Sequence, residues 1–394
     1  MSDKKFFEDL RKEVKNTAND CEYYNKLCKK TNYDFDMPLN DSNLEEIPYI
    51  NWNAFKASNK MFDRLLRIPF EMLSHWTISS STTGDPSIVG RGPEDVFVFQ
   101  ENYKKVFEEY SYMSQIKKLI LFSPKKAFLN RMPGKWMGKR GYLFYRDITD
   151  IWDIDTTFLL FFNKWKVAKY MLTHFRFKAF IEVNSKAFHR ELKKVEEKHI
   201  PALIANSAPL IYRTVTDYKE MIGRTFNMPK NFRIQTGGGG WSGTKGRIKT
   251  DPINKAEFID TLSDFFNVTS NNFADLFGAT ETPAAFGGHW SKNYKDFLLH
   301  VEKNNAQVII RSIDTLERIK DINQKGILEI ITPYGVSSYV GIAVLLDDIV
   351  QIVDLNKCSE CGRENVIVFR HSGRLTPEIG KGCTSYTRLF PFTK

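Results

Sequence analysis

The segment between residues 306 and 354 most constrains the fold, because Val and Ile dominate it in short runs. Clear runs lie at residues 308–310, 327–331 and 349–353. β-Branched residues in runs of this length predict strands, here of one sheet. Residues 176–198 instead place apolar side chains at helical spacing within a charged segment. We therefore expect a mixed α/β fold.

Composition narrows the class of protein further. The chain has 394 residues, 42% hydrophobic and 26% charged, which fits a globular protein of two domains or of one large domain with an appendage. Collagen, coiled coil and overall disorder are excluded. No apolar run approaches the roughly 18–20 residues of a membrane span, and the first residues lack the apolar core of a signal peptide. We expect a cytoplasmic protein without a membrane span.

The net charge of +10 admits nucleic acid, a membrane surface or a phosphorylated ligand as partner. The densest basic stretch, residues 125–146, is interleaved with aromatic residues, a mixture that can bind single strands. Such a mixture is more often a solvated surface over the edge of a core, so we expect no nucleic-acid partner.

The first candidate site is a hydroxyl-rich loop between two strand-like stretches. Residues 79–86 read S-S-S-T-T-G-D-P and offer many hydroxyl and backbone N–H donors, which can wrap a polyphosphate. A solvent-exposed turn is the alternative.

The second candidate is the loop T-G-G-G-G-W-S-G at residues 236–243. Gly238, Gly240 and Gly243 fit G-x-G-x-x-G, but the next helix is predicted to open only at Asp251-Pro252. A Rossmann loop is therefore rejected. A flat ligand lying on bare backbone fits the loop, and so does a plain flexible loop.

Two acidic motifs follow. In residues 277–283, F-G-A-T-E-T-P, a hydroxyl beside a carboxylate can hold a phosphate and its Mg²⁺. Asp347 and Asp348 end a strand, where carboxylates can accept hydrogen bonds from ribose hydroxyls. Ordinary turn carboxylates are the alternative for this pair.

The cysteines suggest two further sites. Cys358 and Cys361 form one C-x-x-C, which supplies two of the four ligands of a structural zinc, and His371, His300 or His289 can complete the set. A reducible pair and two unligated thiols stay open. Gly380-Lys381-Gly382-Cys383 lies near the end of the chain, where a neighbouring cation favours a reactive thiolate, so Cys383 is the best nucleophile candidate.

The order of these motifs resembles that of the adenylate-forming ligases, which activate a carboxylic acid with ATP as an acyl-AMP. It runs from the hydroxyl-rich loop through T-G-G-G-G-W, F-G-A-T-E and the acidic residue after a strand to S-G-R. The chain most resembles phenylacetate-CoA-ligase-like enzymes and, among them, the LuxE-type acyl-protein synthetases of bacterial luminescence operons. K-G-C at residues 381–383 is the most specific feature. The implied fold is a large N-terminal α/β domain of mixed sheets flanked by helices.

The resemblance also implies roles for individual residues. Thr280 would contact the α-phosphate, Glu281 would bind Mg²⁺, and Asp348 would hold the ribose. Arg374 matches the Arg of the hinge segment, and Cys383 would accept the acyl group. The implied nucleotide-binding residues are Ser79, Ser80, Ser81, Thr82, Thr83, Gly84, Gly238, Gly239, Gly240, Phe277, Gly278, Ala279 and Asp348.

The implied function is ATP-dependent activation of a fatty or aryl acid and transfer to Cys383 as a thioester. An acyl-CoA-reductase-like protein or an acyl carrier is the implied partner. Residues 1–374 would form the ligase domain and residues 375–394 a tail, with the large C-terminal lid of other ligases missing or reduced to that tail.

Two departures keep other functions open. Ser81 stands where the family loop has Gly, and Ser87 stands where Lys is common. The C-x-x-C-G-R segment is more similar to phenylacetate-CoA ligases. One alternative is a ligase that passes the acyl group to CoA, a carrier protein or an amine. Another is a catalytically weak nucleotide-binding subunit.

Overall fold

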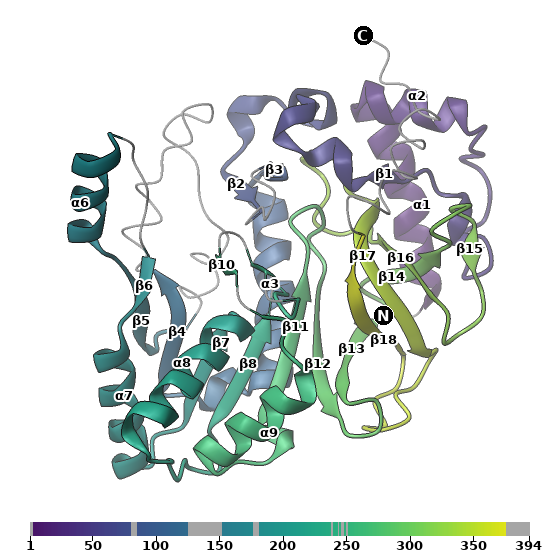
Figure 1. Ribbon diagram of the computed structural model, residues 1–394. Helices are drawn as coiled ribbons and strands as arrows, with labels where there is room; N and C mark the ends of the chain where they lie inside the picture. Colours follow the sequence, from purple (N-terminus) through teal and green to yellow (C-terminus); the bar gives the residue numbers. More distant parts are fainter. Residues whose placement is uncertain are drawn as a thin grey trace.

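A computed structural model describes residues 3–79, 85–124, 152–175, 181–237, 239–242, 244–245, 248–249 and 251–375 (Figure 1). The helices are α1 (Asp3–Asp20), α2 (Glu22–Lys30), α3 (Pro93–Ser111), α6 (Lys164–His174), α7 (Ser185–Lys198), α8 (Ala208–Ile222) and α9 (Lys255–Phe266). The strands are β1 (Ile50–Asn51), β2 (His75–Ile78), β3 (Ile88–Arg91), β4 (Lys118–Pro124), β5 (Asp155–Phe162), β6 (Ile181–Val183), β7 (Ala202–Asn206), β8 (Arg233–Gly237), β9 (Thr244–Lys245), β10 (Ile248–Lys249), β11 (Phe273–Gly278), β12 (Ala285–Ser291), β13 (Asp296–Glu302), β14 (Gln307–Arg311), β15 (Arg318–Ile319), β16 (Lys325–Ile331), β17 (Ala343–Asp354) and β18 (Val366–Arg374).

One large mixed sheet organises the chain. Its order is β15-β14-β16-β17-β18-β13-β12-β11-β8-β7-β4-β5-β6, and β1 pairs with β17. The Val- and Ile-rich segment supplies β14 to β17, as its composition predicts. The mixed α/β fold is therefore confirmed.

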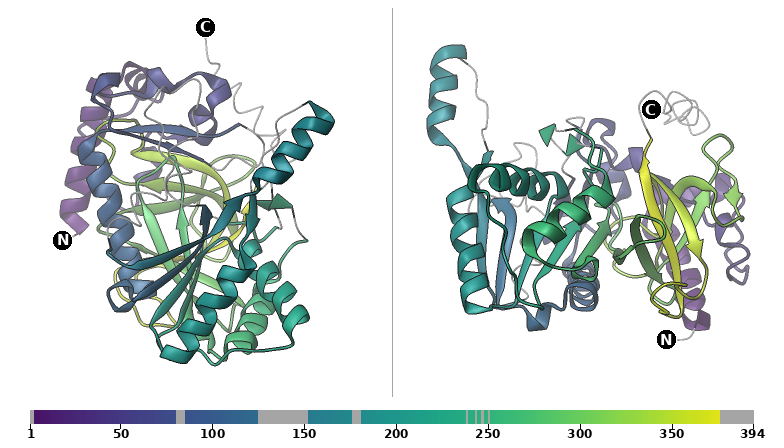
Figure 2. Two further views of the ribbon diagram at one scale, coloured as in Figure 1. Left: turned by 90° about the vertical axis from the view of Figure 1, so that its left-hand side faces the viewer. Right: turned by 60° about the horizontal axis from the view of Figure 1, so that its bottom comes forward.

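The sheet has a parallel half and an antiparallel half. Strands β5, β4, β7, β8 and β11 are parallel, and α7, α8 and α9 cover one face of them while α3 lies on the other (Figures 1 and 2). From β12 to β18 the neighbours in the sheet are antiparallel. The change of direction falls at β11, which pairs in parallel with β8 and antiparallel with β12.

The N-terminal helices pack on the antiparallel half. Phe6, Leu10 and Val14 of α1 are fully buried, as are Tyr24 and, nearly, Cys28 of α2. A break separates α1 from α2, because Cys21 between them takes an extended conformation. Its thiol donates to the Arg64 carbonyl at 3.2 Å, which ties this break to the following segment.

The helix predicted to open at Asp251-Pro252 begins later. α9 starts at Lys255, because the Asn254 side chain accepts hydrogen bonds from the backbone N–H groups of Ala256 and Glu257. This side chain satisfies donors that the first turn leaves unpaired, which fixes the start. Among the described helices, none combines the length and the apolar composition that a membrane span needs.

Candidate active site at the ends of β11 and β18

Asp348 is the centre of the candidate site. It lies within β17, not at the end of a strand as the sequence predicts, because β17 continues to Asp354. It pairs with Arg374 at the end of β18 and is 3% exposed. Its Oδ1 accepts hydrogen bonds from Arg374 Nε at 3.1 Å and from His371 Nε2 at 2.7 Å. Arg374 is 58% exposed, so this cation connects the buried carboxylate with the surface.

The electrostatics separate the two adjacent carboxylates. Burial acts to raise the pKa of Asp348, but the charges and hydrogen bonds of Arg374 and His371 outweigh it and lower this pKa below its usual range. Burial and the negative Asp348 raise the pKa of Asp347. The interaction with Asp348 raises the pKa of Arg374. Asp348 is therefore the carboxylate that stays ionised and able to accept hydrogen bonds from hydroxyls.

The F-G-A-T-E segment continues β11 toward the same place. The ring of Phe277 is centred 5.8 Å from that of His371, and the negative charge of Glu281 acts on Asp347 and on Arg374. The Thr280 carbonyl accepts a hydrogen bond from Arg91 Nη2 at 3.2 Å. The structure thus brings Phe277, Glu281 and the Asp348–Arg374 pair together, although about 70 residues separate the two motifs.

Gly278 allows a close packing contact at the end of β11. A Cβ atom on it would lie 2.0 Å from the Tyr103 hydroxyl oxygen of α3. Any larger residue would therefore displace either α3 or the start of the Thr280–Glu281 segment. Ala279, the next residue, is partly buried against the antiparallel core.

The Gly-rich loop leaves β8 beside β11. Thr236 Oγ1 donates to Asp275 Oδ1 at 2.6 Å, and burial raises the pKa of Asp275. Gly239 and Gly240 have φ values of 68° and 103°, a left-handed backbone that favours glycine. Trp241 then packs on the Phe258 ring with centroids 5.1 Å apart. Both ends of this loop are thereby fixed to the core.

Some predicted site residues lie outside the described residues. They are Ser80, Ser81, Thr82, Thr83, Gly84, Gly238 and Cys383, and the basic stretch at residues 125–146 lies there too. Ser79 and Ser87 border the hydroxyl-rich loop: Ser79 Oγ accepts from the Ser87 N–H at 2.8 Å. β2 and β3 pair as an antiparallel hairpin around it, which confirms the predicted strand–loop–strand order.

Sequence reasoning missed two residues of this site. His371 was considered only as a zinc ligand, but it bonds to Asp348 instead. The backbone of Lys56 forms an isolated antiparallel β-bridge with that of Ser87, next to the hydroxyl-rich loop. The positive charge of Lys56 acts on Asp347. His371 directly precedes S-G-R in the sequence, yet only the pairing of β17 with β18 shows its place beside Asp348.

Cys358 and Cys361 lie away from this site. They gather with His289 and His300, whose ligand atoms and theirs all lie within 4.8 Å of one another. Among the described residues, this is the one group of three or more His, Cys, Asp or Glu side chains that could hold a metal ion.

Two solved structures share this fold. The 2-hydroxyisobutyryl-CoA ligase (HCL), in an open conformation with 2-HIB-AMP and CoA, matches with a TM-score of 0.59 and 12% identity, covering 93% of this chain and 68% of the ligase. The same ligase in its thioesterification state gives 0.60 and 12%, over 94% and 68%. At such identity the likeness shows the fold, which is that of the adenylate-forming ligases.

The family follows from the sequence itself. The model of the acyl-protein synthetase family LuxE matches residues 147–387, more than half of the chain. The chain therefore belongs to the LuxE acyl-protein synthetase family and to the AMP-forming ligases, for which ATP is a substrate. No curated protein matches it.

Proposed function

We propose that the chain activates a fatty acid with ATP and takes the acyl group onto Cys383 as a thioester, for delivery to an acyl-CoA-reductase-like partner. The observation that supports this most is the ionised, buried Asp348 held by Arg374 and His371 next to the F-G-A-T-E segment. In a member of this family, such a carboxylate suits the ribose of ATP and Arg374 suits its phosphates.

The first step makes the acid an acyl donor. A carboxylate oxygen attacks the α-phosphorus, the bond to pyrophosphate breaks, and acyl-AMP forms. Negative charge builds on phosphoryl oxygens, so fixed cations and hydrogen-bond donors accelerate the step. Arg374 and Lys56 supply cations, Thr280 a hydroxyl, and Glu281 an oxygen ligand of the kind that the Mg²⁺ of Mg-ATP prefers.

The second step moves the acyl group to sulfur. The Cys383 thiolate attacks the carbonyl carbon of the mixed anhydride, AMP leaves, and the thiol proton goes to solvent. Acid, ATP and a thiol thus yield a thioester, AMP and pyrophosphate. We place Cys383 in a tail that follows a ligase domain of residues 1–374. We place the protein in the cytoplasm, where thiols stay reduced; the described cysteines Cys21, Cys28, Cys358 and Cys361 are all free.

The test is intact-mass spectrometry of the chain after incubation with Mg-ATP and a panel of fatty and aryl acids, with pyrophosphate release measured in parallel. We expect the mass of one acyl group to be added and neutral hydroxylamine to remove it. Cys383→Ser should abolish the adduct but keep acid-dependent pyrophosphate release. Cys28→Ala, which removes a buried thiol of α2, should keep the adduct.

Two outcomes contradict parts of the proposal. A hydroxylamine-sensitive adduct in Cys383→Ser would show that another residue accepts the acyl group. Pyrophosphate release without any adduct would assign the acyl group to a foreign acceptor such as CoA, a carrier protein or an amine. If neither the adduct nor pyrophosphate release is seen with any acid, the proposed activation step is itself wrong.

A further inference from the structure

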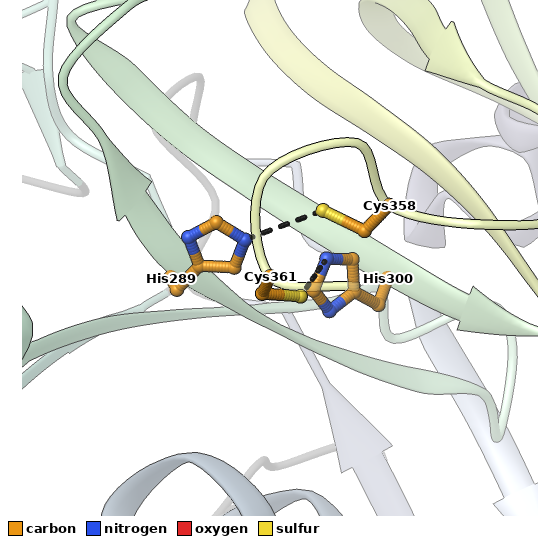
Figure 3. A group of neighbouring side chains, drawn as sticks. All are labelled: His289, His300, Cys358 and Cys361. Atoms are coloured by element: carbon orange, nitrogen blue, oxygen red, sulfur yellow. Dashed lines mark hydrogen bonds between the residues drawn. The ribbon is translucent and has the colours of Figure 1, made fainter. Parts of the chain in front are cut away.

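Four side chains from three separate segments converge at the end of the β17–β18 pair remote from Asp348 (Figure 3). His289 lies on β12, His300 on β13, and Cys358 and Cys361 in the loop between β17 and β18. Cys358 Sγ is 3.5 Å from His289 Nε2, and Cys361 Sγ is 3.9 Å from His300 Nε2. Ligand atoms around a tetrahedral zinc lie about 3.3–3.8 Å apart, given bonds of about 2.0–2.3 Å.

Both imidazole rings are held so that the same nitrogen faces the sulfurs. His289 Nδ1 is 3.2 Å from the Trp290 carbonyl oxygen, and His300 Nδ1 is 2.6 Å from the Tyr110 hydroxyl. In each case Nδ1 is engaged and Nε2 points to the centre of the group. Metal-binding histidines characteristically use their second nitrogen in this way, because the outer hydrogen bond fixes the ring and its tautomer.

A glycine makes room for the outer partner of His300. Gly287 lies opposite His300 in the β12–β13 register, and a Cβ atom on it would lie 2.2 Å from the Tyr110 ring. Tyr110 also accepts a hydrogen bond from Arg363 Nη1 at 2.9 Å. Arg363, which follows the C-x-x-C in the loop, thus helps to hold Tyr110, and Tyr110 in turn holds the ring of His300 on β13.

The cysteine loop is also shaped for binding. The Gly362 N–H donates to the Cys358 carbonyl at 3.0 Å, and backbone N–H groups of Glu360 and Cys361 donate toward the Cys358 sulfur. Gly362 has a φ of 75°, a left-handed conformation that closes the turn. The turn thereby holds both sulfur atoms of the C-x-x-C within 4.8 Å of the ligand nitrogens of the two histidines.

The charges around the group permit a divalent cation. Two thiolates balance Zn²⁺, so a Cys₂His₂ site is neutral and can be buried; Cys358 is fully buried and His300 is 4% exposed. The nearby cation Arg363 is neutralised by Glu109 Oε2 at 2.9 Å and by Glu302 Oε1 at 2.5 Å. Its charge therefore does not oppose a second cation.

We infer that His289, His300, Cys358 and Cys361 bind one structural Zn²⁺. Four protein ligands close the coordination sphere, so this metal has no open position for a substrate and takes no part in acyl activation. It fixes the β17–β18 loop to β12 and β13, and the two thiols give up their protons on binding. The other interpretations are two unligated thiols and a disulfide.

The test is the metal content of the purified full-length chain, measured by inductively coupled plasma mass spectrometry. We expect about one zinc per chain in the wild type and at least about a tenfold loss in Cys361→Ser and Cys358→Ser. The control Cys28→Ala removes a thiol as buried as Cys358 and should keep its zinc. Cobalt added to the reduced, chelator-treated wild type should give the absorption of tetrahedral cobalt–thiolate coordination, a readout that needs no variant.

A second variant tests the outer partner while all four ligands remain. Tyr110→Phe removes the hydroxyl at His300 and should weaken zinc affinity roughly 10- to 100-fold in competition with a chelator. Tyr103→Phe, on the same helix but outside the group, should leave it unchanged. A wild type that holds no zinc and binds no cobalt, or one in which Cys358 and Cys361 form a disulfide in reducing cytosol, overturns the inference. So does zinc retained by both cysteine variants.

Discussion

The two ends of the β17–β18 pair differ in how their charged side chains are balanced. At one end, three carboxylates, Asp347, Asp348 and Glu281, act on one another around Arg374. At the other end, Arg363 meets Glu109 and Glu302, and Asp354 accepts from the Ser359 N–H at 2.8 Å and from its hydroxyl at 2.9 Å. Carboxylates that shift one another's pKa values are typical of sites that bind or react.

This difference separates function from stability along a single pair of strands. The raised pKa of Asp347 reflects burial and the repulsion by Asp348, which a ligand bearing hydroxyls or a cation can relieve. The cysteine loop has no such excess of charge. We therefore expect changes at the first end to affect nucleotide binding, and changes at the second end to affect the unfolding temperature and the metal content.

The largest effect should come from Asp348→Asn. The amide keeps the shape but loses the charge that Arg374 and His371 hold. Hydrogen bonds to charged groups contribute about 1.5–3 kcal/mol, so kcat/KM for ATP in acid-dependent pyrophosphate release should fall roughly 10- to 150-fold.

A matched change at the other end of the β17–β18 pair serves as its control. Asp354→Asn alters two hydrogen bonds to Ser359 and should leave kcat/KM for ATP unchanged. It should lower the free energy of unfolding by about 1 kcal/mol in urea titration. Equal losses of activity in the two variants would show that the two ends do not differ in function.

Gly278→Ala should have a smaller effect, and one that can be reversed. The added Cβ would meet the Tyr103 hydroxyl at 2.0 Å, and overpacking of this kind costs about 1–3 kcal/mol of unfolding free energy. Tyr103→Phe removes the clashing oxygen, so the double variant should regain most of the stability lost. If Tyr103→Phe gives no rescue, the requirement for glycine here does not come from the contact with α3.

The sequence predicted the acidic end in part. Phe277, Thr280, Glu281, Asp348 and Arg374 were identified from motifs, and the structure assembles their segments. The role of His371 was not identified, because nothing near it in the sequence links it to Asp348. That link exists only through the β17–β18 register, where a bulge between Ile349 and Val350 shifts the pairing. Strand register and bulges depend on long-range packing.

At the end of the β17–β18 pair that carries the cysteines, the sequence also predicted the site only in part. The C-x-x-C was visible, and three histidines were equal candidates to complete it. The structure brings His289 and His300 to the C-x-x-C, because β13 pairs with β18 and β12 pairs with β13, whereas His371 bonds to Asp348. The predicted start of α9 was wrong for a local reason. The Asn254 side chain caps the helix, and this cap outweighs the Asp-Pro signal three residues before it.

The smallest effect should come from Lys56, a partly exposed residue that brings a positive charge to the end of the strand pair with Asp347 and Asp348. Its backbone forms a β-bridge with Ser87 next to the hydroxyl-rich loop, and its charge acts on Asp347. A partly exposed cation contributes up to about 1 kcal/mol, so Lys56→Met should raise the Kd for ATP about 2- to 5-fold in low salt. Because salt screens such charges, the difference from the wild type should shrink as ionic strength rises, whereas the loss in Asp348→Asn should persist. The exposed Lys60→Met is the control. Calorimetric titrations with ATP that show no difference between Lys56→Met and Lys60→Met in low salt would exclude Lys56 from the phosphate end of the site.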